Sequence, residues 1–502
     1  MCVALRKKER KELCLRDRCR VVPLVVVSLL GCWNAAMPDG AEGANPTSRK
    51  PNVVFLLVDD LGWADVGCYG ADLHDTPNID RLAAGGMRFT DAYAAAPVCS
   101  PTRASILTGK SPARLHMTIW RESAKNRVFN RKLLPPDTVA DLPHREVTIA
   151  EALQPAGYVS AHVGKWHLGG FTHYPQTMGF PIAIGGTGWG APQTFWWPYS
   201  GRGRFGNEFR YVPHLEWGEP GEYLTDRLTT EAIDVIERLK DRPFFLYMCW
   251  HTVHTPIEGK PELVEKYRRR LKPGLHHQNI EYAAMVESLD QNVGRILAKL
   301  DELGLADHTV VFLTSDNGGY INRFRNRPVT SNAPLRSGKG SLYEGGVRVP
   351  LIVRWPKHVP AGSVCRTPVI SNDFYPTILE LAGAACDHQR NAALDGRSLL
   401  PLLKDPQFDL DRDTLYWHYP HYYPTTSPVS AIRKGDWKLL HYYEDDHLEL
   451  YNLAQDLGEK TNLVERHPDV AQRLKDELVD WLTSVKAQWP RPNPRTRGDQ
   501  PN

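Results

Sequence analysis

The residues Val53-Val54-Phe55-Leu56-Leu57-Val58 form a continuous apolar run that ends at Asp59-Asp60. Such runs are typical of strands buried on both faces, as in a parallel sheet covered by helices. Similar runs recur at 158–163, 244–250, 309–314 and 351–353. Residues 282–300 carry apolar side chains at helical spacing before Gly304. Strands alternating with helices predict an α/β fold with a large, mixed, mostly parallel sheet sandwiched by helices.

The character of the sequence changes near residue 411. Residues 431–440 predict two strands joined by a turn at Gly435-Asp436, and residues 448–453 predict another strand. A helix is expected over 470–485, so we predict a small C-terminal antiparallel sheet with a packed helix. The expected divisions are an export signal (1–36), a linker (37–50), a large α/β domain (51–410), an α+β subdomain (411–489) and a disordered tail (490–502).

The charge balance excludes one class of partner. The 502 residues include 61 basic and 58 acidic ones, a formal net charge of +3. Basic residues are not gathered into one folded stretch, so nothing in the charge pattern indicates nucleic acid binding. The length and the 42% hydrophobic content suit a soluble globular chain with a large core.

The N-terminus has the pattern of an export signal. A densely charged segment at 6–20 precedes an apolar run at 21–30. This run is shorter than the roughly 20 residues of a membrane-spanning helix. Leu29-Leu30-Gly31-Cys32 also resembles a bacterial lipoprotein cleavage box, and the sequence leaves a lipoprotein signal and a plain cleaved signal equally open. We therefore expect an exported protein that is periplasmic, lipid-anchored or secreted, with a membrane contact only through such an anchor.

Polar side chains follow four of the predicted strands, at Asp59-Asp60, Lys165-Trp166-His167, His251 with His254, and Asp316-Asn317. Because ligands gather at the carboxyl ends of strands in α/β sheets, these side chains are expected to form one site. The oxygen atoms of the aspartates and of Asn317 are ligands that calcium or magnesium prefers. The two histidines raise the alternative of zinc, but no soft third ligand lies near them in sequence.

A fifth element of the predicted site is the segment Cys99-Ser100-Pro101-Thr102-Arg103. Pro101 suits the first turn of a helix, and a helix N-terminus favours a bound anion. Arg103, on the same helix face as Cys99, can donate several hydrogen bonds to that anion. The spacing alone fits a buried structural cysteine equally well.

The cysteine count also draws attention to this segment. Four of nine cysteines lie in the leader, and the remaining five are Cys68, Cys99, Cys249, Cys365 and Cys386. An odd number of cysteines in an exported protein indicates that one thiol is not paired with another and has a different chemical role. Pairing of Cys365 with Cys386 stays open.

The segment Cys99-Ser100-Pro101-Thr102-Arg103, followed by Leu107-Thr108-Gly109, resembles the sulfatase maturation motif Cys-x-Pro-x-Arg. In that family the cysteine is oxidised to formylglycine. Further stretches resemble family blocks in the family order, at 52–62, 76–83, 164–169, 244–256, 314–318, 338–340 and 343–346. From about residue 51 to 463 the chain thus resembles the formylglycine-dependent, arylsulfatase-like members of the alkaline phosphatase superfamily.

The resemblance implies roles for the matching residues. The residues expected to hold a divalent cation, usually calcium with magnesium as the alternative, are Asp59, Asp60, Asp316, Asn317 and the modified Cys99. Arg103 would stabilise the hydrated formylglycine. The residues that match sulfate-binding and proton-transfer positions are Lys165, His167, His254 and Lys339. A formylglycine-generating enzyme would be the partner in maturation.

The resemblance also implies a mechanism for cleaving a sulfate ester. One hydroxyl of the aldehyde hydrate would attack sulfur, while cationic groups and the metal offset the charge on the sulfuryl oxygens. His254 or Lys339 would protonate the leaving alcohol. His167 would deprotonate the second hydroxyl, which expels sulfate and restores the aldehyde. The mechanism needs two hydroxyl groups on the same carbon, and a hydrated aldehyde has them whereas a thiol does not. An aldehyde is therefore needed at position 99.

Two aromatic clusters, at 189–199 and 416–423, suggest a sulfated carbohydrate as the substrate, because aromatic rings stack on sugars. Packing in the core is the alternative explanation for most of these rings. Two other functions were considered, a phosphoesterase or phosphonate hydrolase of the same superfamily and a non-catalytic glycan-binding relative. Cys99 within its motif argues against the first. Retention of Lys165, His167 and Lys339 argues against the second.

Overall fold

The computed structural model describes residues 50–124, 130–204, 206–385 and 393–497, which all belong to the unit Arg49–Asn502. The predicted export signal, the lipoprotein box and residues 37–49 of the predicted linker lie outside the described residues. Cys386 also lies outside them, so its pairing with Cys365 stays a prediction. Among the described residues, no helix combines the length and the apolar character needed to cross a membrane.

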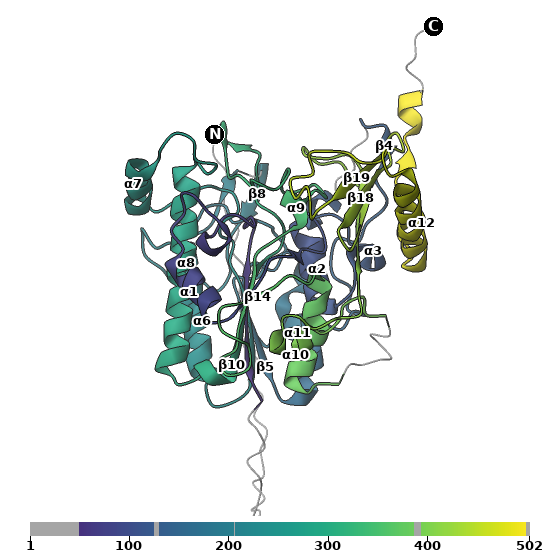
Figure 1. Cartoon of the computed structure of the whole chain (residues 1–502). Helices are drawn as coiled ribbons and strands as arrows, with labels where there is room; N and C mark the ends of the chain where they lie inside the picture. Colours follow the sequence, from purple (N-terminus) through teal and green to yellow (C-terminus); the bar gives the residue numbers. More distant parts are fainter. Residues whose placement is uncertain (1–49, 125–129, 205, 386–392, 498–502) are drawn as a thin grey trace, which may run out of the picture. The chain divides into compact units, whose positions relative to one another are not determined.

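An eight-stranded sheet forms the centre of the fold (Figure 1). In spatial order its strands are β14 (Ser363–Cys365), β2 (Met87–Phe89), β13 (Leu351–Arg354), β10 (Thr309–Ser315), β1 (Asn52–Val58), β9 (Phe244–Cys249), β5 (Val159–Gly164) and β6 (Ile182–Ile184). The neighbours from β10 to β6 are all parallel, and β13 runs antiparallel to both β10 and β2. The predicted mixed, mostly parallel sheet is confirmed.

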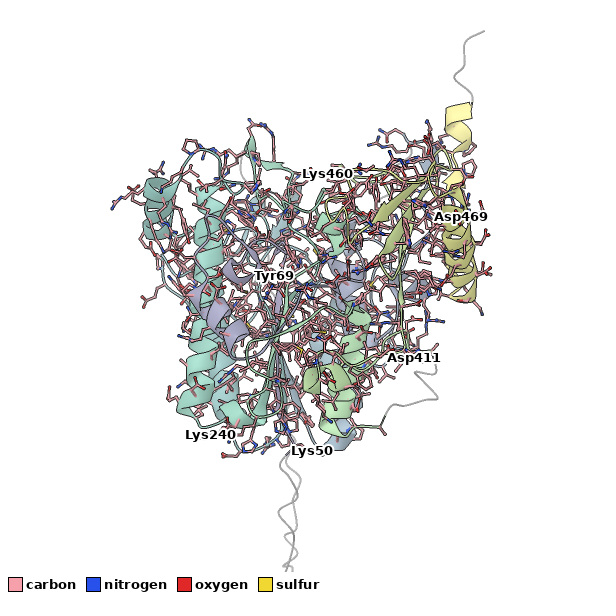
Figure 2. All side chains as sticks on the ribbon, in the orientation of Figure 1. Lys50, Tyr69, Lys240, Asp411, Lys460 and Asp469 are labelled. Atoms are coloured by element: carbon pink, nitrogen blue, oxygen red, sulfur yellow. The ribbon has the colours of Figure 1, made fainter. Side chains whose placement is uncertain are left out.

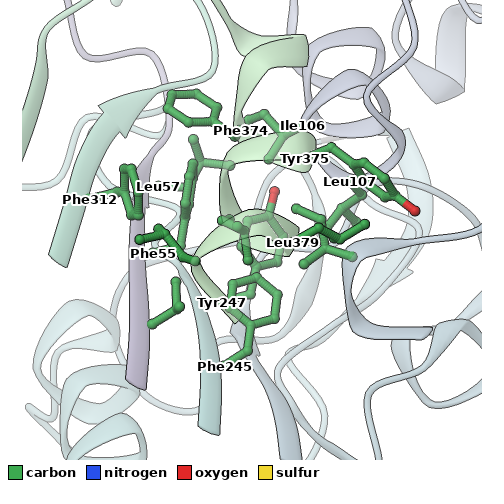
Figure 3. Close-up of a cluster of buried hydrophobic side chains, with 14 of the residues drawn as sticks. Phe55, Leu57, Ile106, Leu107, Phe245, Tyr247, Phe312, Phe374, Tyr375 and Leu379 are labelled. Atoms are coloured by element: carbon green, nitrogen blue, oxygen red, sulfur yellow. The ribbon is translucent and has the colours of Figure 1, made fainter. Parts of the chain in front are cut away.

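The apolar run of β1 serves two cores, because successive side chains point to opposite faces of the sheet. Phe55 and Leu57 join one core with α2 (Cys99–Thr108), α5 (Ile149–Leu153), α10 (Phe374–Ala382) and α11 (Leu400–Lys404). In Figure 3 the ring of Phe55 stands edge-on to Phe374, with ring centroids 4.9 Å apart. Leu56 joins the opposite core with α1 (Pro77–Ala84), α6 (Leu224–Leu239) and α8 (Ile280–Glu302). Helices therefore cover both faces, as predicted (Figure 1).

A four-stranded antiparallel sheet follows near the C-terminus, in the order β16 (Thr414–Tyr419), β17 (Val429–Lys434), β18 (Trp437–Tyr442) and β19 (Leu448–Asn452). Helix α12 (Pro468–Ser484) packs on one face of it through Leu474, Leu478 and Leu482. The other face packs against residues around Tyr93 and Val347 of the larger part of the chain. The predicted small sheet with a packed helix is confirmed (Figure 1). Within the stretch expected to be a disordered tail, β20 (Arg491–Pro492) pairs with β4 (Leu133–Leu134).

Shorter elements connect these layers. The remaining helices are α3 (Pro112–Leu115), α4 (Arg121–Ala124), α7 (Pro261–Arg270) and α9 (Glu344–Val347). The remaining strands are β3 (Ala92–Tyr93), β7 (Gly201–Gly203), β8 (Gly206–Arg210), β11 (Arg323–Phe324), β12 (Arg327–Pro328) and β15 (Val369–Ile370). The 3-10 turns are η1 (Gly67–Tyr69), η2 (Gln154–Ala156), η3 (Phe171–His173), η4 (Pro175–Met178), η5 (Ala306–His308), η6 (Ser371–Asp373) and η7 (Pro494–Arg497).

The direction of β1 decides which end of the sheet carries the polar groups. In Figure 2, Lys50, two residues before β1, lies at the bottom of the view together with Lys240 at the end of α6. The parallel strands start at this end and finish at the opposite one. The carboxyl ends of β1, β5, β9 and β10 therefore lie side by side.

Candidate active site

Residues that follow three of the parallel strands meet at the carboxyl end of the sheet. Asp59 and Asp60 follow β1, Lys165 follows β5, and Asp316 follows β10; all four are buried. Lys165 Nζ donates to Asp59 Oδ2 at 2.6 Å. The backbone N–H of Asp60 donates to Asp316 Oδ1 at 3.2 Å. The structure thus brings together side chains that the sequence placed only by strand position.

Asp60 is the centre of a second group of contacts. Lys339 Nζ donates to its two carboxylate oxygens at 2.6 and 2.9 Å, and Asn317 Nδ2 donates to Oδ1 at 2.8 Å. Burial on its own would raise the pKa of Asp60, but the charge of Lys339 holds that pKa below its ordinary value. Asp60 is therefore an ionised carboxylate inside the protein.

Cys99 is the first residue of α2 and lies beside both aspartates. Its Sγ is 3.5 Å from Asp59 Oδ1 and 3.5 Å from Lys339 Nζ. No side chain caps the helix at Val98, so the first backbone N–H groups of α2 are available to an anion. Gly109, at φ 68°, ends the helix in the left-handed conformation. Burial raises the pKa of the Cys99 thiol, and a protonated thiol is a poor nucleophile.

Arg103 lies one helical turn after Cys99 and is completely buried. Its Nε donates to Asp316 Oδ2 at 2.8 Å, and its Nη1 donates to the backbone oxygen of Lys165 at 2.9 Å. Its Nη2 is buried without a hydrogen-bond partner. Arg103 thus ties α2 to the ends of β5 and β10 and retains one unused donor.

His254 stands beside the carboxylates, with its Nε2 3.6 Å from Asp60 Oδ2. Its Nδ1 lies 2.8 Å from the backbone oxygen of Thr255, which places the ring proton on Nδ1 and leaves Nε2 as an acceptor. Burial and the charge of Lys339 lower the pKa of His254 to about 3. One ligand atom from each of His254, Asp59, Asp60 and Cys99 lies within 4.8 Å of the others. His251 is buried and is not part of this group.

His167 is held by Glu122, a residue that the sequence did not single out. Its Nε2 lies 2.6 Å from Glu122 Oε2, and the N–H of Gly190 donates to Glu122 Oε1 at 2.9 Å. Burial lowers the pKa of His167 to about 4, although the charge of Glu122 opposes this shift. His167 Nδ1 is buried without a hydrogen-bond partner. The ring is therefore neutral at neutral pH, with Nδ1 as its acceptor atom.

A cavity of about 250 Å³ opens onto these groups. Its walls include five predicted site residues, which are Asp60, Cys99, His167, His254 and Lys339. Its walls also include Trp120, Glu122, Arg210, Tyr320 and Tyr423. Asp59, Arg103, Lys165, Asp316 and Asn317 are not among its lining residues.

The carboxylates fit a divalent cation. Burial raises the pKa of Asp59 to about 7, and the nearby charges of Asp316 and Asp60 add to this effect while Lys165 opposes it. Asn317 Oδ1 is buried without a hydrogen-bond partner. A hard cation would relieve the carboxylate repulsion and give the amide oxygen a partner. The oxygen donors therefore fit calcium or magnesium.

Two family models match the chain. The sulfatase model covers residues 51–384, and the model for the C-terminal part of N-sulphoglucosamine sulphohydrolase covers residues 338–487. The first match includes every predicted site residue. The chain belongs to the sulfatase family. It is a sulfuric ester hydrolase, and the family prediction is confirmed.

Relatives of this sulfatase include enzymes named for sugar and steroid substrates. Human N-acetylgalactosamine-6-sulfatase is 34% identical over 89% of this chain and 87% of the human protein. Mouse steryl-sulfatase is 34% identical over 80% of this chain and 72% of the mouse protein. Among solved structures, Ps i-CgsB in complex with k-i-k-neocarrahexaose has a TM-score of 0.73 and 30% identity, over 86% of this chain and 93% of the other.

The two aromatic clusters of this sulfatase are mostly packing residues. Phe195 and Tyr199 lie in the core on one face of the large sheet, and Trp417 and Tyr419 lie under the C-terminal sheet. Tyr423 is the member of the clusters that lines the cavity. Trp120, which also lines it, comes from a stretch without a recognisable pattern. Glu122 lies in the same stretch, which explains why spacing could not identify either residue.

Proposed function

We propose that this sulfatase removes sulfate from a sulfated carbohydrate through a formylglycine made from Cys99, with a divalent cation held by the strand-end carboxylates. The observation that carries this proposal is the position of Cys99. Its Sγ lies at the N-terminus of α2, 3.5 Å from both Asp59 Oδ1 and Lys339 Nζ, in the wall of the cavity. An oxygen nucleophile at this position meets both an anion-binding helix terminus and a metal-type donor set.

Modification of Cys99 accounts for a thiol that is otherwise unsuited to catalysis. The buried thiol is protonated at neutral pH, whereas most cysteine nucleophiles act as thiolates. A hydrated aldehyde supplies one hydroxyl for attack on sulfur and a second hydroxyl whose deprotonation releases sulfate. Arg103, Lys165 and Lys339 place positive charge around this position and favour an anionic substrate group.

The cation ligands in this proposal are Asp59, Asp60, Asp316, Asn317 and the modified residue 99, and calcium is the preferred ion. A bound divalent cation supplies charge that stabilises the sulfuryl oxygens. Lys165 donates a hydrogen bond to Asp59, and Lys339 donates one to Asp60. These lysines therefore orient the two carboxylates that would face the ion.

Proton transfer is assigned to residues on the cavity wall. Lys339 carries protons that it can deliver to a leaving alkoxide. His254 is the second group on this wall, but its neutral ring must first take up a proton at Nε2 before it can donate one. His167 is assigned the role of base toward the modified residue 99, because its Nδ1 is an unused acceptor in a neutral ring. Glu122 is a positioning residue, because it acts on the reaction through His167.

The relatives and the cavity both support a carbohydrate substrate. The human relative is named for a sulfated amino sugar, and the solved relative holds a neocarrahexaose. In this chain Trp120 and Tyr423 meet edge to face with ring centroids 5.5 Å apart, at the wall of the cavity. Arg210 and Glu122 supply polar groups beside these rings. A steroid sulfate is the second candidate, because a steryl-sulfatase is similarly related.

The proposal includes export and maturation. The leader 1–36 directs the chain out of the cytoplasm, to the periplasm, a lipid anchor or the medium, as a lipoprotein or after plain cleavage. A formylglycine-generating enzyme modifies Cys99 during production. In this proposal the catalytic domain is 51–410, and it is followed by the C-terminal α+β subdomain 411–489.

Release of inorganic sulfate from sulfated glycans and steroid sulfates, and of inorganic phosphate from phosphate monoesters, tests the proposed function. The purified, modified enzyme is expected to act fastest on a sulfated glycan, and the Cys99→Ala variant is expected to be inactive. Exclusive hydrolysis of steroid sulfates would contradict the carbohydrate assignment. Faster hydrolysis of phosphate esters would contradict the sulfatase mechanism.

A further inference from the structure

A second buried group of metal-type ligands lies apart from the site described above. Its members are Asp65, His74 and His277, all buried, and one ligand atom from each lies within 4.8 Å of the others. Asp65 belongs to the loop after β1, His74 precedes α1, and His277 precedes α8. We propose that these three side chains form a structural metal site that binds zinc. The proposed zinc site does not depend on the sulfatase mechanism.

The distance between two of the ligand atoms suits zinc. His277 Nε2 lies 3.3 Å from Asp65 Oδ1, and it is buried without a properly aligned hydrogen bond. Zinc binds nitrogen and oxygen at about 2.0–2.2 Å in a tetrahedron, which separates neighbouring ligand atoms by roughly 3.3–3.5 Å. An ion between these two atoms would give His277 Nε2 the partner that it lacks.

Both imidazole rings are oriented as zinc ligands usually are. His277 Nδ1 lies 2.6 Å from Asp72 Oδ1, and His74 Nδ1 lies 2.8 Å from the backbone oxygen of Asp65. Metal-binding histidines generally donate their other ring N–H to a carboxylate or a backbone carbonyl, which fixes the ring and its tautomer. In this arrangement Nε2 is the metal-binding atom of His277, and Nε2 is the nitrogen of His74 that the Nδ1 hydrogen bond leaves for a metal; His74 Nδ1 itself lies 3.9 Å from Asp65 Oδ1.

Hydrogen bonds also fix the orientation of the Asp65 carboxylate. Its Oδ2 accepts hydrogen bonds from the N–H of Gly62 and the hydroxyl of Tyr282, each at 2.7 Å. Its Oδ1 accepts one hydrogen bond, from the Thr330 hydroxyl at 2.6 Å, and keeps a lone pair on the side of His277. Two imidazoles and one carboxylate are a borderline-soft ligand set, which favours zinc over calcium or magnesium.

A neighbouring cavity gives a cation access to this site, and the position of the site shows which loop the ion would stabilise. His74 lines a surface cavity of about 360 Å³ together with Asp75, Asp80 and Asp290, so a cation can reach the ring from solvent through an acidic opening. The ion would join the loop that carries Asp59 and Asp60 to the starts of α1 and α8. The zinc site would therefore stabilise the loop on which the first set of carboxylates depends.

The test uses the full, folded enzyme in calcium-containing buffer, after treatment with a chelator that prefers zinc. Zinc is then titrated, and bound zinc per chain and the melting temperature are measured. One zinc per chain and a melting temperature that rises with zinc concentration are expected. His74→Gln and His277→Gln should each lose the bound zinc. His276→Gln, which changes the exposed neighbouring histidine, should retain it, and so should Asp316→Asn, which alters the other site.

Zinc that is retained by both His74→Gln and His277→Gln, or a folded wild-type enzyme that binds none, would overturn the proposal. In that case His277 is held as a charged imidazolium between Asp65 and Asp72. If the histidine variants do not fold, cobalt titration of the wild-type enzyme decides. Intense visible absorption of tetrahedral cobalt is expected, and the weak absorption of an octahedral ion would contradict the site.

Discussion

His167 and Glu122 form a hydrogen-bonded pair in the wall of the cavity, with His167 Nε2 2.6 Å from Glu122 Oε2. Because the carboxylate faces Nε2, the ring proton lies on that nitrogen and Nδ1 is the free acceptor. The pair resembles the base–carboxylate arrangement of other hydrolytic enzymes, in which the carboxylate fixes the tautomer of the base. It connects a residue found by resemblance with one found only in the structure.

Substitution Glu122→Gln should reduce kcat about 10- to 100-fold, because the amide no longer fixes the tautomer of His167. Glu122 raises the pKa of His167 against the effect of burial, so its removal lowers that pKa further. The acidic limb of the kcat/KM profile should therefore move to lower pH. Steady-state kinetics across pH test this, with Glu262→Gln on exposed α7 as the control. An unmoved limb would contradict the assigned pair.

Substitution Gly190→Ala should displace the base without unfolding the enzyme. A Cβ at Gly190 would come within 2.3 Å of His167 Cε1. A displacement of about 1 Å in a reacting group can reduce the rate about 100-fold. We expect a loss of that order in kcat and a nearly unchanged melting temperature. Equal losses of activity and stability would indicate that Gly190 serves packing instead.

Removal of the cation should abolish activity reversibly. Chelation leaves Asp59, Asp60 and Asp316 with uncompensated repulsion, so both activity and melting temperature should fall. Added calcium should restore both. Asn317→Leu removes an amide oxygen that has no hydrogen-bond partner, and it should raise the calcium concentration needed for half-maximal activity. Full activity of the enzyme after exhaustive chelation would contradict the cation proposal.

The attachment of the C-terminal sheet depends on a buried lysine. Lys438 Nζ on β18 lies 2.7 Å from Glu344 Oε1 and 2.9 Å from Glu459 Oε1, and all three side chains are buried. Lys438→Met leaves the buried Glu459 without its ion-pair partner, although Glu344 keeps Arg348, and it should lower the free energy of unfolding by about 3–5 kcal/mol. Lys434 lies on β17 of the same sheet, and Lys434→Met breaks its partly exposed ion pair with Glu477 of α12, which should cost about 0–1 kcal/mol. Urea denaturation of both variants provides the comparison, and equal losses would contradict the role of Lys438.

Much of the fold follows from apolar runs in the sequence. The predicted strands at 53–58, 158–163, 244–250, 309–314 and 351–353 correspond to β1, β5, β9, β10 and β13. The three-residue strands β2, β6 and β14 are too short to show a period, and the antiparallel direction of β13 is set by tertiary pairing.

The site residues also fall into two groups, those whose meeting the sequence predicts and those that only the folded chain brings together. Asp59, Lys165 and Asp316 could be predicted to meet because they follow parallel strands of one sheet, whose carboxyl ends share one edge. Glu122 and Gly190 lie in irregular segments, so only the folded chain brings them to His167. The cluster of Asp65, His74 and His277 likewise joins one segment, which holds Asp65 and His74, to a distant one with no common motif.

The most direct test of the central claim is the mass of the peptide that contains residue 99, measured in catalytically active enzyme from a host with a formylglycine-generating enzyme. The peptide should carry an aldehyde in place of the Cys99 thiol, and specific activity should rise in proportion to the converted fraction. Full sulfatase activity in a preparation whose Cys99 is entirely an unmodified thiol would contradict the proposed mechanism.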